Sequence, residues 1–298
     1  MRDHSNIGLD ETLERARALV PDLRARAARQ DEARHLLPET AEAIRAHGLL
    51  RYQMPKRWGG MELEFPAVVE VPAIIAHGCG STSWDFHALA NHSWLLGMYD
   101  PRGQEEVWGD DPDVLIAAGI AFPQGRGRKV DGGFVISGHW NFCSGVGVSP
   151  WSMLAATIRE RDDGPPVDYR MCIVRRGEFE VLDDWHVMGM RGTGSQSSRV
   201  TDLFVPEYRA LSMLTIRGGS EFPGARVNPG PLFRVPIVAA AGYFPAPTAL
   251  GTADAMLALV LDRIGGKDSV QSVQLRVAHA AAKIEAARQL ARSDTRRL

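Results

Sequence analysis

Two aromatic side chains, a thiol and two hydroxyls lie within nine consecutive residues, SGHWNFCSG, at positions 137–145. The run follows residues 133–136, whose aromatic and β-branched side chains predict a strand, and glycines flank its polar end. A flat aromatic surface beside a hydroxyl suits a planar ligand with a polar edge. The rings supply apolar contact, and Ser144 can donate or accept a hydrogen bond. This run is therefore the first candidate site.

A second candidate is the run MGMRGTGSQSSRVTDLFVP at residues 188–206. The backbone N–H groups of its Gly-Thr-Gly-Ser turn could bind an anion or the polar edge of a cofactor. Thr193 and Ser195 would add hydroxyls, and Arg191 a guanidinium. Spacing alone favours a simpler interpretation, a hairpin turn with solvated hydroxyls.

Two histidines lie in the apolar stretch at residues 84–98, which predicts a buried helix. His87 and His92 are five positions apart, so we expect them not to share a helical face, and we predict no metal site. Each alone is more often a core residue than a catalytic one. The dinucleotide, P-loop, nucleophile-elbow and zinc-protease motifs are also missing from the sequence.

The whole sequence predicts a globular protein, because 298 residues with 45% hydrophobic side chains can bury a large core. A net charge of -2 gives no electrostatic reason to expect nucleic acid or an anionic membrane as a partner. Three cysteines without CxxC spacing, Cys79, Cys143 and Cys172, argue against disulfides and predict a cytoplasmic location. We expect no secretion signal and no membrane span, since charges interrupt the apolar runs.

Helical periodicity in the first third gives way to short strand-like runs between about residues 114 and 212, and then returns. The predicted class is α+β. We expect an N-terminal helical domain at 1–113, a central antiparallel β domain at 114–212, and a linker with C-terminal helices at 213–298.

Several ordered segments together resemble one known family. They are IRAHGLLRYQMPKRWGG, GCGSTSW leading into LANHSWLLGMY, VDGGFVISGHWNFCSG and MGMRGTGSQSSRVTDLFVP. In this order they resemble the acyl-CoA dehydrogenase superfamily, and most closely its flavin-dependent monooxygenase branch, the oxygenase components of two-component aromatic hydroxylases. Acyl-CoA dehydrogenases proper usually have Thr-Glu-Pro and Gly-Ser-Asp where this chain has AFPQGRGRKVDGG, and Trp-Ile-Thr-Asn/Ser-Gly where it has NFCSG.

The resemblance implies a function. Reduced FMN or FAD, supplied by a separate flavin reductase, would react with O2 to a C4a-hydroperoxide and hydroxylate a phenolic or polyketide-type aromatic substrate. A homotetramer is the family's usual assembly. Family members end in a four-helix bundle, of which residues 247–298 provide about two helices, so the bundle looks truncated.

The resemblance also implies roles for individual residues. Ser144 would lie beside flavin N5, and His92 would be the catalytic base facing the substrate, with His87 a structural neighbour. The other expected flavin contacts are the apolar wall of Trp140 and Phe142, the small buried Cys143, the polar Arg191, Thr193 and Ser195, and Arg234 facing the negative charge of the reduced flavin.

Three alternatives stay open at this point. The same fold supports N-oxygenation of an amino sugar, for which a base matters less. An acyl-CoA dehydrogenase would need a catalytic glutamate, which we cannot assign. A non-catalytic relative with an incomplete bundle would bind no flavin.

Overall fold

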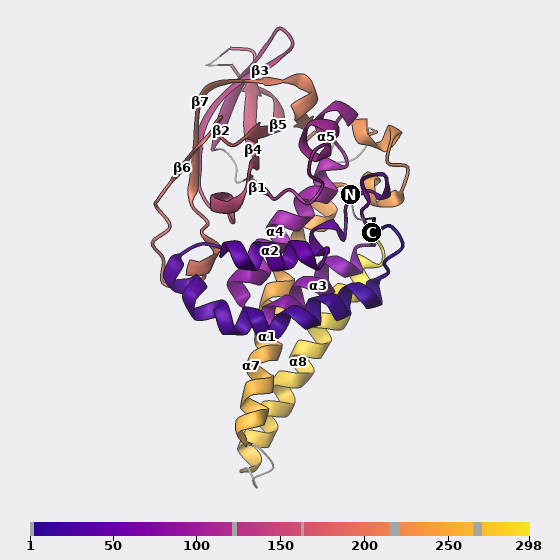
Figure 1. Cartoon of the computed structure of the whole chain (residues 1–298), viewed down its shortest axis with the longest axis vertical. Helices are drawn as coiled ribbons and strands as arrows, with labels where there is room; N and C mark the ends of the chain where they lie inside the picture. Colours follow the sequence, from indigo (N-terminus) through magenta and orange to yellow (C-terminus); the bar gives the residue numbers. More distant parts are fainter. Residues whose placement is uncertain (1–2, 121–123, 162–163, 215–220, 265–269) are drawn as a thin grey trace.

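The computed structural model describes residues 3–120, 124–161, 164–214, 221–264 and 270–298. Five helices come first, then eight strands, then three helices (Figure 1). The leading helices are α1 (Leu9–Ala33), α2 (Pro38–Ala46), α3 (Pro66–Ala76), α4 (Gly80–Leu96) and α5 (Pro101–Trp108). The closing ones are α6 (Ile237–Ala240), α7 (Ala246–Ile264) and α8 (Gln271–Thr295). The predicted order of helices, sheet and helices is confirmed.

The strands form one sheet in the order β6-β7-β3-β2-β4-β5-β8, with β1 also paired to β4. They are β1 (Ile116–Gly119), β2 (Gly125–Val130), β3 (Gly133–Trp140), β4 (Trp151–Arg159), β5 (Pro166–Arg175), β6 (Glu180–Leu182), β7 (Ser197–Pro206) and β8 (Ala210–Ser212). The expected antiparallel sheet is confirmed only in part, because β1 and β2 both pair with β4 in parallel, whereas the other described pairings are antiparallel. After β3 the chain crosses back through the 3-10 turn η3 (Val146–Val148), so β4 begins beside the start of β1.

Helix α4 lies between the helical layer and the sheet, in contact with α3, β1 and α7. Its buried residues, polar as well as apolar, are spread around the helix, as expected for a helix covered on most of its faces. Phe86, Leu89 and Trp94 are each at most 2% exposed. A helix held this firmly is a rigid support for the side chains it presents.

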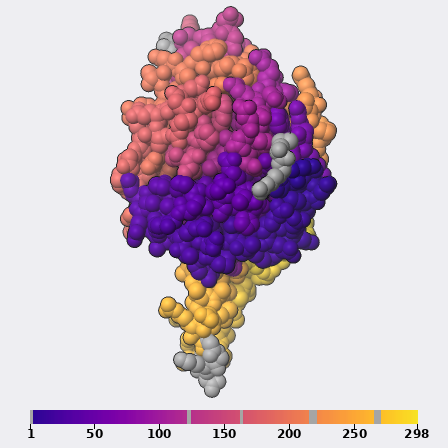
Figure 2. All heavy atoms as spheres, in the orientation of Figure 1, coloured from indigo at the N-terminus to yellow at the C-terminus, as the bar shows by residue number. Residues whose placement is uncertain are grey.

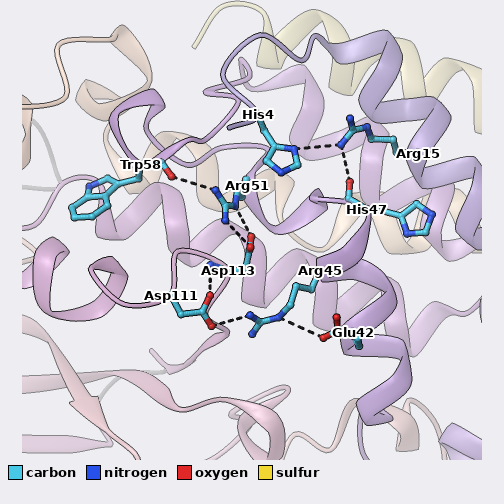
Figure 3. Close-up of polar contacts among 9 residues, drawn as sticks. All are labelled: His4, Arg15, Glu42, Arg45, His47, Arg51, Trp58, Asp111 and Asp113. Atoms are coloured by element: carbon cyan, nitrogen blue, oxygen red, sulfur yellow. Dashed lines mark hydrogen bonds and ion pairs between the residues drawn. The ribbon is translucent and has the colours of Figure 1, made fainter. Parts of the chain in front are cut away.

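A buried ion pair fixes the segment that leads into β1 (Figure 3). Arg51, at the end of the 3-10 turn η1 (Leu49–Arg51), is 2% exposed and donates two hydrogen bonds to Asp113, at 2.5 and 2.6 Å. Asp111 accepts from the Asp113 backbone at 3.0 Å and from Arg45 at 2.8 Å. The two parallel hydrogen bonds between Arg51 and Asp113 fix the start of β1. They therefore also fix the position of the Ile116 carbonyl, three residues beyond Asp113.

Helices α7 and α8 form a hairpin that projects from the body of the molecule (Figures 1 and 2). Its apolar residues Met256, Leu259, Leu261 and Leu290 are 50 to 64% exposed. By length and composition alone, Ile237–Ile264 could cross a membrane, with a mean hydropathy of 1.4 in its most apolar window. From the sequence we expected no membrane span, because charges interrupt the apolar runs. The mean hydropathy of this segment is high even though it contains the charged Asp254.

The base of the hairpin is held where α7 packs on α3 at Gly251. A Cβ at this position would lie 2.0 Å from the Ala73 carbonyl oxygen and 2.7 Å from the Ala76 Cβ. We expect Gly251→Ala to lower the free energy of unfolding by about 1–3 kcal/mol, because backbone must move to admit the methyl group. Chemical denaturation measures this. Gly242→Ala is the matched control, since nothing lies within 4 Å of its added Cβ; equal stability of the two variants would contradict the prediction.

Candidate functional site

A cavity of about 270 Å³ opens between α4, the sheet and the segment before α7. Its lining is mostly apolar and aromatic, which is typical of sites for small organic ligands. The lining residues are Trp84, His87, Ala88, Asn91, His92, Trp94, Leu95, Ala118, Ile120, Phe142, Ser144, Met171, Ile237, Phe244 and Pro245. The first seven come from α4, so this one helix provides most of the polar groups.

A larger pocket of about 510 Å³ lies between α1, α3, α7 and α8. Most of its charges are already paired with each other, including Arg292 with Glu70 at 2.6 Å and Arg288 with Asp254 at 2.8 Å. We therefore assign the chemistry to the smaller cavity, which brings histidines, a serine hydroxyl and aromatic rings together.

The two candidate runs of the sequence meet beside this cavity. Strands β3 and β7 pair antiparallel, with Trp140 opposite Ser198. Beyond the strands the Cys143 N–H donates to the Gln196 carbonyl at 3.1 Å, and the Gly145 N–H to the Thr193 carbonyl at 3.0 Å. These bonds bring the hydroxyls of the second run against Ser144.

Four side chains form a hydrogen-bonded chain that ends in a carbonyl. The Trp84 indole N–H donates to Ser144 at 2.9 Å. Ser144 and Ser195 lie 2.7 Å apart, Ser195 and Thr193 lie 2.6 Å apart, and Thr193 donates to the Met190 carbonyl at 2.9 Å. An indole can only donate and a carbonyl can only accept, so the two ends fix every proton between them.

The order of protons determines what Ser144 can offer to a ligand. Thr193 uses its proton on Met190, so Ser195 must donate to Thr193, and Ser144 must donate to Ser195. The Ser144 proton is therefore committed, and only the remaining lone pair of its oxygen is available toward the cavity. Ser144 acts as a hydrogen-bond acceptor there.

His92 faces the cavity with a fixed tautomer. Its Nδ1 lies 2.6 Å from the Ile116 carbonyl oxygen, and because a carbonyl only accepts, Nδ1 bears the proton. In the neutral ring, Nε2 then holds a free lone pair. Burial lowers the pKa of His92 to about 4, although the Ile116 carbonyl acts in the opposite direction, so the ring is neutral at physiological pH.

His87 also lines the cavity, although it and His92 lie on different faces of α4. Residues five apart are separated by about 140° around a helix, and the cavity wraps far enough around α4 to reach both. Burial and the nearby His92 lower the pKa of His87 to about 3. Asn91 lies 2.9 Å from its Nδ1 and 3.0 Å from its Nε2, and the Tyr52 hydroxyl donates to the Asn91 carbonyl oxygen.

The aromatic residues of the first run occupy different places. Phe142 lines the cavity, is 65% exposed and meets the Trp185 ring edge to face at 6.0 Å. Trp140 is fully buried, and its indole donates to the Ala155 carbonyl at 2.7 Å within the sheet. The structure thus places Phe142 at the cavity wall and Trp140 in the core beneath it. Phe142 lies beyond the end of β3 and has a positive φ of 63°, so its side chain no longer follows the alternation that turns Trp140 into the core.

Cys143 is fully buried, and its thiol donates to the Trp140 carbonyl at 3.3 Å. Burial raises the pKa of this thiol to about 11, so it is unreactive and fills space, and the flavin contact that we also expected of it is not supported by the described lining of the cavity.

Neither predicted arginine lies in the described lining of the cavity. Arg191, in the 3-10 turn η4 (Arg191–Thr193), pairs with Asp31 of α1 at 3.4 Å. Arg234, in the 3-10 turn η8 (Pro231–Arg234), donates to the carbonyls of Pro229 and Gly230 in its own loop. Both guanidinium groups are therefore already bonded to protein groups outside the cavity lining.

Sequence reasoning missed Trp84, Asn91, Tyr52 and Phe244. Trp84, His87, Ala88, Asn91 and Leu95 follow helical spacing, so the stripe containing the missed Trp84 and Asn91 was detectable in principle. Tyr52 and Phe244 come from distant segments, and nothing in their local sequence indicates the cavity. No group of three or more potential metal ligands occurs in the part of the chain that the structure describes.

Comparison with known proteins gives a consistent result. Residues 243–298 match the family model "Acyl-CoA dehydrogenase, C-terminal domain". The chain is 36% identical over 218 residues to the flavin-dependent monooxygenase oxygenase subunit HsaA of Mycobacterium tuberculosis, a match that covers 73% of this chain and 54% of HsaA. It is 32% identical to the oxygenase component of the FADH(2)-dependent resorcinol hydroxylase of a Rhizobium species, over 93% of this chain and 71% of that protein.

The crystal structure of the M. tuberculosis HsaA monooxygenase superimposes on the structure of this chain with a TM-score of 0.92 and 31% identity. The superposition covers 97% of this chain and 75% of the HsaA chain. The sequence match to the first curated relatives spans only 54 to 58% of their length.

Proposed function

Because this chain belongs to the acyl-CoA dehydrogenase superfamily, among the oxygenase components of flavin-dependent monooxygenases, we propose that it hydroxylates a phenolic aromatic compound. The observation that supports this most directly is the apolar cavity in which His92 offers a free Nε2 lone pair. The co-substrates would be O2 and a reduced flavin, FMN or FAD, delivered by a separate reductase.

The residues around Ser144 fit a reduced flavin. A reduced isoalloxazine bears a hydrogen on N5, and the committed proton of Ser144 leaves an acceptor for that hydrogen. Phe142 and Trp84 add aromatic surface at the cavity wall. When bound, the reduced flavin supplies the two electrons with which one atom of O2 enters the ring and the other leaves as water.

His92 suits a phenol rather than a charged substrate. Its Nε2 can accept the hydrogen bond of a phenolic hydroxyl, and withdrawal of that proton makes the ring carbon more nucleophilic. The apolar walls exclude water from this contact. No Asp or Glu occurs among the described lining residues, whereas an acyl-CoA dehydrogenase would need a carboxylate base at the substrate.

Reduced-flavin binding followed by product analysis tests the proposal. The protein would be titrated anaerobically with reduced FMN and with reduced FAD, then exposed to O2 together with simple phenols. We expect a catechol-type product with one oxygen atom from labelled O2. Binding without any hydroxylated phenol, or reduction of bound FAD by an acyl-CoA, would contradict it.

Ser144→Ala tests the role of the serine separately. We expect hydrogen peroxide release per flavin oxidised to rise about tenfold relative to product, since one hydrogen bond to the flavin edge is lost. Binding of reduced flavin should weaken while binding of oxidised flavin changes little. Ser149→Ala is the matched control: it is a buried serine in the same loop, bonded to the Gly145 carbonyl. Equal peroxide release from the two variants would refute the assignment.

We also propose that the protein works as a homo-oligomer. The support is the exposed apolar surface of the α7–α8 hairpin, which includes Met256, Leu259 and Leu290.

A further inference from the structure

The cavity contains two neutral histidines whose hydrogen-bonding polarity is set from outside the cavity. His92 gives its Nδ1 proton to the Ile116 carbonyl at 2.6 Å and therefore presents a lone pair. His87 has a different partner, the side-chain amide of Asn91, so its polarity has to be derived separately.

The Asn91 side-chain amide lies between Tyr52 and His87, with its oxygen toward Tyr52 and its nitrogen toward His87. Burial raises the pKa of Tyr52, so the phenol keeps its proton and donates it to the Asn91 carbonyl oxygen. The amide nitrogen, which can only donate, then faces His87 at 2.9 to 3.0 Å. The amide nitrogen lies almost equally far from the two ring nitrogens, so it offers a donor to this ring and no acceptor.

A neutral imidazole has one protonated nitrogen, so one of the two ring nitrogens of His87 must be an N–H donor. Tyr52, Asn91 and His87 are 0, 4 and 6% exposed. Among the described residues His87 has no acceptor, since its polar neighbour there is the Asn91 amide nitrogen, itself a donor. An N–H group left without an acceptor in a buried site lowers affinity for any ligand that cannot pair with it.

We propose that His87 is a specificity-determining residue, which donates a hydrogen bond to an acceptor oxygen carried by the substrate. This inference rests on the proposed function and names its substrate class: phenols with a second oxygen substituent, such as a carbonyl, an ether or another hydroxyl. The phenolic hydroxyl donates to His92, and the second oxygen accepts from His87.

The surroundings of His87 support this selectivity. The Phe244 ring lies 5.0 Å from the imidazole, and the rest of the lining is apolar apart from Asn91, His92, Ser144 and the Trp84 indole. Of these, Asn91 is bonded to Tyr52 and His87, and the Trp84 N–H to Ser144. Together with the second N–H of the Asn91 amide beside it, His87 is thus the donor in the described lining that remains for a substrate, and a ligand with two oxygens satisfies both histidines at once.

A ligand pair of matched shape tests the proposal. Ethylphenols and hydroxyacetophenones differ by one carbonyl oxygen, and each exists as ortho, meta and para isomers. Dissociation constants would be measured anaerobically by equilibrium dialysis, with reduced flavin present, so that no turnover occurs. We expect at least one hydroxyacetophenone isomer to bind about tenfold more tightly than its ethylphenol counterpart.

Two variants separate the donor from the residues that orient it. His87→Phe should abolish the preference, so that the ratio of the two dissociation constants falls to about 1. The dissociation constant for ethylphenol should stay within about twofold of that of the natural protein. Tyr52→Phe should also lower the preference, because the Asn91 amide can then turn either end toward His87. His279→Phe, on α8 and outside the cavity, is the control and should retain the full preference.

Equal affinities for all three isomer pairs, or a preference that survives His87→Phe, would overturn the proposal. Aerobic product analysis is scored separately. A protein that shows the His87-dependent preference but makes no hydroxylated product would contradict the proposed activity while supporting the role of His87.

Discussion

His92→Ala is expected to lower the rate of hydroxylation by about 100-fold or more. General base catalysis by a positioned histidine contributes on this scale, and the variant removes the lone pair that accepts the phenolic proton. Stopped-flow product formation at saturating phenol measures the effect. Reduced-flavin binding should change little, because Ser144 and its chain to Met190 do not involve His92.

The matched comparison is His92→Gln. A glutamine can accept a hydrogen bond but cannot take up a proton at neutral pH, so we expect substrate affinity to recover in this variant while the rate does not. His279→Ala serves as the control outside the cavity. If His92→Gln restored the rate of the natural protein, His92 would orient the substrate and would not act as a base.

The low pKa of His92 adds a pH dependence to this expectation. With a pKa of about 4 in the folded protein, the lone pair is available throughout the range from about pH 5 upward. Hydroxylation should therefore show no inflection near pH 6.5, the usual value for histidine. An inflection there, absent from His92→Gln, would show that the ring is less buried during turnover than in this structure.

Burial of both histidines also affects stability. Their pKa values fall from about 6.5 in the unfolded chain to about 3 and 4 in the fold, so the unfolded state binds more protons below pH 6.5. The fold is thus destabilised as the pH falls from 6.5 toward 4, by about 1.4 kcal/mol per pH unit for each histidine at most.

Part of the site could be predicted from sequence and part could not. The hydroxyls of Ser144, Thr193 and Ser195 lie next to turn glycines, and the local pattern singled them out. The three hydroxyls come together only because β3 pairs with β7. The local sequence of either run does not predict this pairing. Thr193 and Ser195 consequently lie behind Ser144, whose proton they fix, instead of facing the cavity.

The residues whose side chains do not lie where the sequence analysis expected them share one physical cause. Local sequence records which side chains are suited to chemistry, but not the direction in which packing turns them. Trp140 follows the alternation of β3 into the core, whereas Phe142, two residues later, has left the strand with a positive φ of 63° and turns outward. The pairing of His87 with Asn91 and Tyr52 likewise joins α4 to a segment 35 residues earlier, which no helical periodicity can reveal.

Asp85→Asn is expected to stabilise the protein increasingly as the pH rises. Asp85, on α4, is fully buried, and neither of its carboxylate oxygens has a hydrogen-bond partner among the described residues. Burial raises the pKa of this carboxyl well above its usual value, so the folded state keeps the proton that the unfolded chain loses above about pH 4. Stability of the natural protein should then fall by about 1.4 kcal/mol per pH unit from this group, opposite in sign to the histidine effect.

An asparagine has nearly the same shape and leaves a similar polar group unpaired, so below pH 4 the two proteins should have nearly equal free energies of unfolding. Above pH 4 the variant does not titrate, and the difference should grow until the pH reaches the pKa of Asp85 in the fold. Urea denaturation at several pH values measures that difference directly, and the pH at which it levels off gives this pKa. The exposed Asp131→Asn should show no such trend; a difference for Asp85→Asn that is constant with pH would mean that its carboxylate is ionised in the fold.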